Sequence, residues 1–157
     1  NNKSIAWLLK NYNRIYDDPD MALDIYTRQC SIGVTAKQLA TMAATIANGG
    51  KNPVTKQQVF KPELSPKIAS MMATVGFYEH TGDWLFTTGL PAKTGVGGGI
   101  MGVVPGVVGV AAFAPPLDEA GNSVKAQKAL AYIAGHLNLN IFGTTRCVMA
   151  EKEAAQA

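Results

Sequence analysis

The stretch LPAKTGVGGGI, from Leu90 to Ile100, leads into an apolar segment that turns at Pro105 and Gly106. From residue 76 to residue 122, glycines, aromatic and β-branched residues dominate, and helical periodicity is absent. This pattern predicts three strands, over residues 92–96, 100–104 and 107–114, with the last two joined by the Pro105–Gly106 turn. The strands are apolar on both faces, which favours a sheet buried between layers of helix.

Helices are predicted on the N-terminal side of this sheet. Asp18 and Pro19 are typical of a helix cap and a first-turn proline, and Thr35 with Gln38 forms a capping box. Asn48 and two glycines end the helix that this capping box opens. We therefore expect helices over residues 3–12, 19–29, 36–47 and 65–75, and a polar loop over 52–63.

The sheet is followed by a predicted loop over 115–122 and an amphipathic helix over 123–137. Helices, an antiparallel sheet and a helix laid on the sheet define an α+β fold. We expect one domain over 1–142, with a helical part over 1–75 and the strands and closing helix over 76–142. The polar tail over 143–157 is expected to be loosely ordered.

Composition excludes several classes of protein. The chain has 157 residues, of which 47% are hydrophobic and 16% charged, as in a globular domain. The net charge of +3 comes from scattered residues, so we expect no nucleic-acid partner. Residues 100–113 are apolar but fall short of the roughly 20 residues of a membrane span, so no membrane partner is expected. Cys30 and Cys147 lack metal-site spacing, which favours a cytoplasmic protein without metal.

Lys93, Thr94 and Gly95 are the best local clue to chemistry. A lysine, a hydroxyl residue and a glycine in succession form one wall of the acyl-transfer site in serine hydrolases of the penicillin-binding and β-lactamase type, which combine it with a Ser-x-x-Lys helix. None of the five serines here has a lysine three places on. Because Asn1 is not an initiator methionine and an amphipathic pattern begins at once, we expect a C-terminal portion of a longer protein.

The position after Gly95 offers a mechanism. The backbone N–H of Val96 lies at a strand edge, where it suits an oxyanion, while Lys93 and Thr94 supply a charge and a hydroxyl beside the substrate. The alternative is a solvated edge lysine beside a turn. Tyr26 and Tyr78 are further candidates because a phenol donates hydrogen bonds or relays a proton, although interfacial tyrosines are more often part of a core.

Two other patterns are weaker. Gly97, Gly99 and Gly102 match GxGxxG, but a strand and a Pro-Gly turn follow where a dinucleotide site needs a helix. Cys30 with His80 or His136 is a formal nucleophile–base pair without a recognisable local signature. We therefore interpret the glycines as allowing close backbone approach in a strand.

Taken together, six runs resemble the serine-dependent glutaminases, in order and in register from Asn1 to about Phe142. These runs are Ser4–Lys10, Ile25–Ser31, Met42–Gly50, Gly89–Ile100, Val103–Pro105 and Pro115–Val124. The resemblance implies a β-lactamase-like fold and hydrolysis of L-glutamine to L-glutamate and ammonia without a cofactor. It places the nucleophilic serine and its lysine in the family's N-terminal half, which becomes the expected partner, and we expect a homo-oligomer, either a dimer or a tetramer.

The resemblance also implies roles for residues of this chain. Asn2, Tyr26, Tyr78 and Val96 are expected to bind substrate, with Val96 acting through its backbone N–H and Tyr78 helping to handle the proton. Lys93, Thr94 and Gly95 support the site. Two alternatives remain open. One is another hydrolase of the same fold, acting on β-lactams or peptides, and the other is a non-catalytic binding or structural module.

Overall fold

A computed structural model describes residues 1–144 and 147. The chain divides into two compact units, Asn1–Val34 and Thr35–Ala157, and each is described here by itself. Within the described residues no helix is long and apolar enough to cross a membrane. The part of the predicted tail at 145–146 and 148–157 lies outside the described residues.

The first unit consists of two helices, α1 (Asn2–Asn11) and α2 (Pro19–Cys30). Asp18 caps α2 as predicted, because its side chain accepts a hydrogen bond from the Asp20 amide at 2.9 Å and Pro19 occupies the first turn. The ammonium of Lys3 lies 3.4 Å from the Asp20 carboxylate, which links the two helices. The predicted helices at 3–12 and 19–29 are confirmed to within a residue at each end.

The second unit begins with α3 (Ala36–Ala47), which has the predicted capping box: the Thr35 hydroxyl accepts from the Gln38 amide, and the Gln38 side chain accepts from the Thr35 amide. A short 3₁₀ helix, η1 (Pro62–Leu64), then leads into α4 (Ser65–Val75). The Ser65 hydroxyl donates a hydrogen bond to the Ile46 carbonyl, which ties the start of α4 to the end of α3. Both predicted helices are confirmed.

The sequence did not predict the next two elements. A 3₁₀ helix, η2 (Tyr78–His80), and an α-helix, α5 (Thr81–Thr88), lie in the segment where helical periodicity is absent. The helix is short and contains Gly82, so local propensity is weak. Tertiary contacts stabilise it instead: the Trp84 ring stacks on Phe77 at 4.4 Å, and its Nε1 donates to the Leu90 carbonyl at 2.8 Å.

The sheet has three antiparallel strands in the order β1-β2-β3, namely β1 (Ala92–Thr94), β2 (Gly99–Val104) and β3 (Val108–Phe113). The three predicted strands are confirmed, β1 and β3 with shorter bounds and β2 beginning one residue earlier, as is the turn at Pro105 and Gly106. Gly99 and Gly102 of the GxGxxG pattern lie within β2, and a turn and β3 follow where a dinucleotide site needs a helix, which agrees with the interpretation that these glycines do not form such a site.

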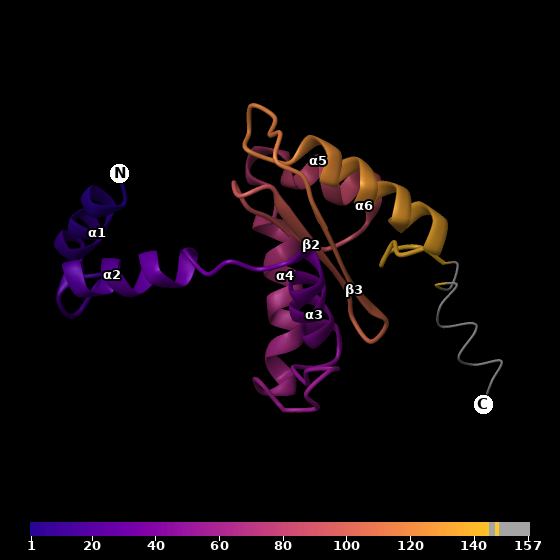
Figure 1. The fold of residues 1–157 in the computed structure, drawn as a ribbon, viewed down its shortest axis with the longest axis horizontal. Helices are drawn as coiled ribbons and strands as arrows, with labels where there is room; N and C mark the ends of the chain where they lie inside the picture. The colour runs from indigo at the N-terminus through magenta and orange to yellow at the C-terminus, as the bar shows by residue number, and fades with distance from the viewer. Residues whose placement is uncertain (145–146, 148–157) are drawn as a thin grey trace. The chain divides into compact units, whose positions relative to one another are not determined.

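Helices cover both faces of the sheet in the second unit (Figure 1). Side chains of β2 alternate between two cores: Ile100 and Val104 join the core that contains Trp84 and Leu130, whereas Val103 joins the core of α3 and α4. The first core is closed by α6 (Val124–Leu137), capped by the Ser123 hydroxyl, which accepts from the Ala126 amide. The predicted α+β fold with a buried antiparallel sheet and a closing helix is confirmed.

Candidate active site

Tyr78 lies where the chain leaves α4 and enters η2, and its backbone has an uncommon conformation. Its φ is 52°, in the left-handed region that side chains other than glycine adopt at a cost in free energy. The residue is 41% exposed, so part of Tyr78 is accessible from solvent. Left-handed residues of this kind cluster at functional sites, which adds a structural reason to consider Tyr78 as a site residue.

Hydrogen bonds from three other parts of the fold fix the backbone of residues 76–78. The Phe77 amide donates to the Thr81 hydroxyl at 3.0 Å, and that hydroxyl donates to the Tyr78 carbonyl at 2.7 Å. The amide nitrogen of the Asn122 side chain donates to the Phe77 carbonyl at 3.4 Å. The Thr94 amide donates to the Gly76 carbonyl at 3.0 Å, so the segment is also tied to β1.

Lys93 projects from β1 toward Tyr78. Its ammonium nitrogen lies 5.0 Å from the centre of the Tyr78 ring, within the range of a cation–π contact. The same ammonium donates to the Thr94 carbonyl at 2.6 Å. Partial burial lowers the pKa of Lys93 from its ordinary value. A positive charge beside an accessible phenol makes this edge of the sheet suited to an anionic reaction intermediate.

Thr94 is placed differently from the arrangement that the sequence predicts. Side chains alternate along a strand, so Lys93 and Thr94 point to opposite faces of β1. Thr94 is only 3% exposed, and its hydroxyl has no hydrogen-bond partner among the described residues. Thr94 therefore supports this edge through its backbone bond to Gly76, while its hydroxyl lies in the interior.

Val96 lies in the tight turn that connects β1 to β2. The Gly95 amide donates to the Gly99 carbonyl at 3.0 Å, and the Gly98 amide donates to the Gly95 carbonyl at 2.9 Å, which fixes the turn around Val96. The Val96 amide itself makes no hydrogen bond within the described part of the chain. Its side chain is 69% exposed. The turn thus holds a backbone donor at an accessible position.

Gly121 shows that Tyr78 and Val96 are neighbours. A Cβ atom added at Gly121 would lie 3.4 Å from Cγ1 of Val96 and 3.6 Å from ring atom Cε2 of Tyr78. Gly121 has a φ of 94°, which favours glycine, and no side chain fills the space between the two residues. The structure therefore brings Tyr78, Lys93 and Val96 together, as the predicted site requires, at the loop that precedes α6.

Asp118 organises this loop. Its carboxylate accepts from the Asn122 amide at 2.8 Å and from the Gln127 side chain at 2.9 Å, and the His80 ring nitrogen lies 3.9 Å away. Burial would raise the pKa of Asp118, but these hydrogen bonds and His80 outweigh it and hold the pKa below its ordinary value. An ionised Asp118 thus fixes the residues that adjoin Tyr78.

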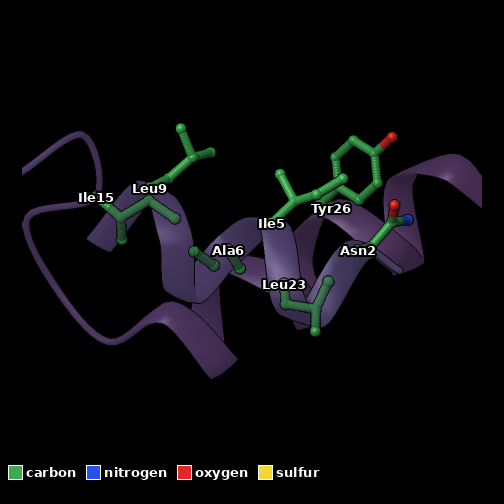
Figure 2. Close-up of a pocket in the computed structure, with 8 residues that line it drawn as sticks. Asn2, Ile5, Ala6, Leu9, Ile15, Leu23 and Tyr26 are labelled. Carbon is green, nitrogen blue, oxygen red and sulfur yellow. The ribbon is translucent and has the colours of Figure 1, made fainter. Parts of the chain in front are cut away.

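Asn2 and Tyr26 lie together in the first unit, from α1 and α2. Both line a pocket whose other walls are mainly apolar, formed by Ile5, Ala6, Leu9, Ile15, Ala22 and Leu23. Figure 2 shows the Asn2 carboxamide and the Tyr26 phenol at the same end of this pocket, away from Leu9 and Ile15. The polar groups of both residues thus lie at the same end of an otherwise apolar pocket.

The other candidate residues form no comparable arrangement. The Cys30 thiol is exposed and donates to the neighbouring Gln29 side chain at 3.6 Å. The His136 ring stacks on Tyr132 with 3.9 Å between ring centres. No group of three His, Cys, Asp or Glu side chains among the described residues is arranged to hold a metal ion. Sequence reasoning did not single out Thr81 and Asn122, because no local motif marks their bonds to Phe77.

Tyr78, Lys93 and Val96 thus gather at one edge of the sheet of the second unit. A glutaminase family model matches residues 1–142 of the chain. The chain therefore belongs to the glutaminase family. Its β-lactamase-like α+β fold is also found in solved glutaminase structures, described next.

Among curated relatives, the glutaminases of Parabacteroides distasonis and Bacteroides fragilis are each 70% identical over 151 residues, which is 96% of this chain and 47% of the relative. The chain thus spans about half the length of the curated relatives it matches. A solved structure of a probable glutaminase, YbaS, is 50% identical with a TM-score of 0.88, over 90% of this chain and 46% of its own.

A second solved structure is the covalent complex of a Bacillus subtilis glutaminase with 5-oxo-L-norleucine, formed by reaction with 6-diazo-5-oxo-L-norleucine. It is 30% identical with a TM-score of 0.84, over 89% of this chain and 50% of its own. The likeness to these structures thus extends over most of this chain and about half of each of theirs.

Proposed function

We propose that this chain forms the oxyanion-binding and substrate-binding part of a glutaminase that hydrolyses L-glutamine to L-glutamate and ammonia through a serine acyl-enzyme. The observation that carries the proposal is a Val96 amide without a hydrogen bond among the described residues, in a residue whose side chain borders Gly121 together with the ring of Tyr78. Lys93 lies over that ring. Membership of the glutaminase family supports the substrate. The covalent norleucine adduct of the Bacillus subtilis protein supports a covalent intermediate in that relative.

The proposed role of Val96 is to stabilise negative charge. When a serine attacks the side-chain amide of glutamine, the carbonyl oxygen becomes an oxyanion, and a rigid N–H donor stabilises it. The Gly95–Gly98 turn holds the Val96 amide without an acceptor among the residues that the structure describes, so the donor is placed to bind this oxygen. The amide of the nucleophile itself would be the second donor.

Tyr78 is proposed to move the proton. Its phenol is accessible and lies next to Val96, so it is placed to give a proton to the departing ammonia or to receive one from the serine. The ammonium of Lys93 lies 5.0 Å from the centre of the ring, which places a positive charge at the same site. Asn2 and Tyr26, which line one end of the same pocket, are proposed to bind the amino-acid end of glutamine.

The nucleophile is proposed to come from outside these residues. No serine in the sequence is followed by lysine three places on, and the chain spans about half of its relatives. We propose that the part of the family's domain that this chain does not match supplies the serine, its lysine and strands that complete the sheet. The isolated chain is then expected to be inactive. A homo-oligomer and a cytoplasmic location stay predictions.

The test uses a fusion protein, in which the part of the Parabacteroides distasonis glutaminase that precedes the matched segment is joined to this chain. Ammonia release from L-glutamine is expected from the fusion protein and not from either part alone. Tyr78→Phe should lower kcat by about 10²-fold or more, since general acid–base catalysis contributes roughly 10² to 10⁴. Tyr26→Phe should mainly raise KM.

Three results would contradict the proposal. Turnover of a β-lactam or a peptide in preference to glutamine would favour another hydrolase of this fold. No turnover by a folded fusion protein would favour a binding or structural module. Full glutaminase activity in both tyrosine variants would contradict the roles assigned to these two side chains.

A further inference from the structure

Tyr78 keeps its left-handed backbone although it is not a glycine, so other residues must hold it there. A φ of 52° places its Cβ close to the following carbonyl, and the extended or helical conformation is the more stable choice for a free tyrosine. The position of the phenol depends on this backbone, because the side chain leaves the Cα in a different direction in each conformation. Whatever fixes the backbone therefore fixes the phenol.

Thr81 bonds to the backbone on both sides of the Tyr78 Cα. Its hydroxyl accepts from the Phe77 amide at 3.0 Å and donates to the Tyr78 carbonyl at 2.7 Å. One hydroxyl thus uses its donor and an acceptor on consecutive residues, and an extended Tyr78 would carry its carbonyl away from that hydroxyl. Thr81 is also the first residue of α5, so these two hydrogen bonds connect the backbone at Tyr78 to a helix.

Asn122 holds the same segment from the interior. Its side chain is fully buried, and its Nδ2 donates to the Phe77 carbonyl at 3.4 Å. Its Oδ1 has no partner among the described residues. A buried carboxamide with an unpartnered oxygen costs stability, so the bond to Phe77 is the interaction that accounts for its presence.

Asp118 fixes the loop around Asn122, because its carboxylate accepts a hydrogen bond from the backbone amide of Asn122 at 2.8 Å. Gly121, the preceding residue, borders the space between Tyr78 and Val96. Asn122, which bonds to Phe77, and Gly121, which borders Tyr78 and Val96, therefore belong to one loop. This loop and the helix α5 are two separate elements that both contact the segment around Tyr78.

We infer that Thr81 and Asn122 are positioning residues for the reaction, which hold Tyr78 in its left-handed conformation and thereby place its ring next to Gly121 and Val96. Neither side chain needs to touch the substrate. This inference rests on the proposed function, because it assigns Tyr78 the proton-transfer role described above.

The experiment compares Thr81→Val and Thr81→Ser in the fusion protein. Valine keeps the shape of threonine and loses the hydroxyl, whereas serine keeps the hydroxyl. Thr81→Val should lower kcat by about tenfold with little change in KM, because a small misplacement of a catalytic group lowers the rate steeply. Thr81→Ser should restore kcat to within about threefold.

Thr87→Val is the matched control. Thr87 lies in the same helix, and its hydroxyl donates to the Asp83 carbonyl at 2.7 Å and to the Trp84 carbonyl at 3.2 Å rather than to the Tyr78 backbone. Thermal unfolding of all variants shows whether they are folded. Asn122→Leu is a second variant with the same expected loss of kcat, read only if it unfolds cooperatively.

The decisive comparison repeats Thr81→Val in a Tyr78→Phe background. If Thr81 acts through the phenol, the second substitution should lower kcat by less than about twofold there, because residues that act as a unit are not additive. The inference would be overturned if Thr81→Val lowered kcat equally in both backgrounds. It would also be overturned if Thr81→Val did not lower kcat in the protein that keeps Tyr78. An inactive unsubstituted fusion protein would instead overturn the proposed function, and the inference with it.

Discussion

The ammonium nitrogen of Lys93 lies 5.0 Å from the centre of the Tyr78 ring, so a strand and a 3₁₀ helix bring a cation and a phenol together. The same ammonium is partly buried, which lowers the pKa of Lys93 from 10.5. Between the lowered value and 10.5, the unfolded chain binds more protons than the folded one. The free energy of unfolding contributed by Lys93 therefore rises as pH rises through that window.

Lys93→Met should remove this rise. The change in free energy of unfolding of the fusion protein between about pH 8 and about pH 10 is expected to be less positive in Lys93→Met than in the unsubstituted protein. Lys128→Met is the control, because Lys128 is an exposed residue of α6. Urea unfolding at both pH values measures the difference. Equal pH dependence in all three proteins would contradict the burial of the Lys93 charge.

Gly121→Ala should lower both stability and activity. The substitution costs about 1 kcal/mol or more because φ is 94°, and the added methyl group enters the space between Tyr78 and Val96. Gly106→Ala separates the two effects: φ is 74° there, but no atom lies within 4 Å of the added Cβ. Both variants should unfold at lower temperature, and only Gly121→Ala should lose glutaminase activity. Equal activity losses would show that Gly121 does not border the site.

Asp118 should make the protein sensitive to acid. Its pKa is held below the ordinary 3.8, so its contribution to stability is present above that value and is lost as pH falls through the lower folded value. Asp118→Asn should therefore destabilise the protein at neutral pH and have less effect near pH 3, where about half or more of the unfolded-state carboxyls are protonated. Glu119→Gln, an exposed neighbour in the same loop, is the control. A constant effect of Asp118→Asn at both pH values would contradict the ionised carboxylate.

Thr94→Val tests the buried hydroxyl. Because Oγ1 of Thr94 has no partner among the described residues, its replacement by a methyl group should leave stability unchanged or raise it by about 1 kcal/mol. Since this hydroxyl points away from Lys93, KM for glutamine should change little. Thermal unfolding and steady-state kinetics measure both. A large rise in KM would instead support a hydroxyl that contacts the substrate.

Local signals in the sequence predicted most of the elements. The capping box at Thr35 and the proline after Asp18 satisfy backbone groups within one turn, so their effect is visible without tertiary structure. The helix α5 was missed because Trp84 stabilises it through Phe77 and Leu90, and neither contact leaves a periodic pattern. Tertiary packing overrode a weak local propensity there.

The site was predictable only in part, for a similar reason. Lys93, Tyr78 and Val96 were found from a short motif and a family resemblance. The orientation of Thr94 follows from strand alternation, which becomes certain only when the register of β1 with β2 is known. The left-handed backbone of Tyr78, and the bonds of Thr81 and Asn122 that hold it, arise from long-range contacts that no local sequence pattern encodes.

The most direct test of the proposed site is the effect of removing the Val96 N–H on kcat. Val96→Pro deletes the donor, whereas Val96→Ala keeps it and shortens a side chain that is 69% exposed. Loss of one oxyanion donor costs about 10² to 10³ in kcat, so the fusion protein with proline should lose about that factor and the alanine variant less than about threefold. If the proline variant, shown to be folded by thermal unfolding, keeps the kcat of the alanine variant, the Val96 amide does not stabilise the oxyanion.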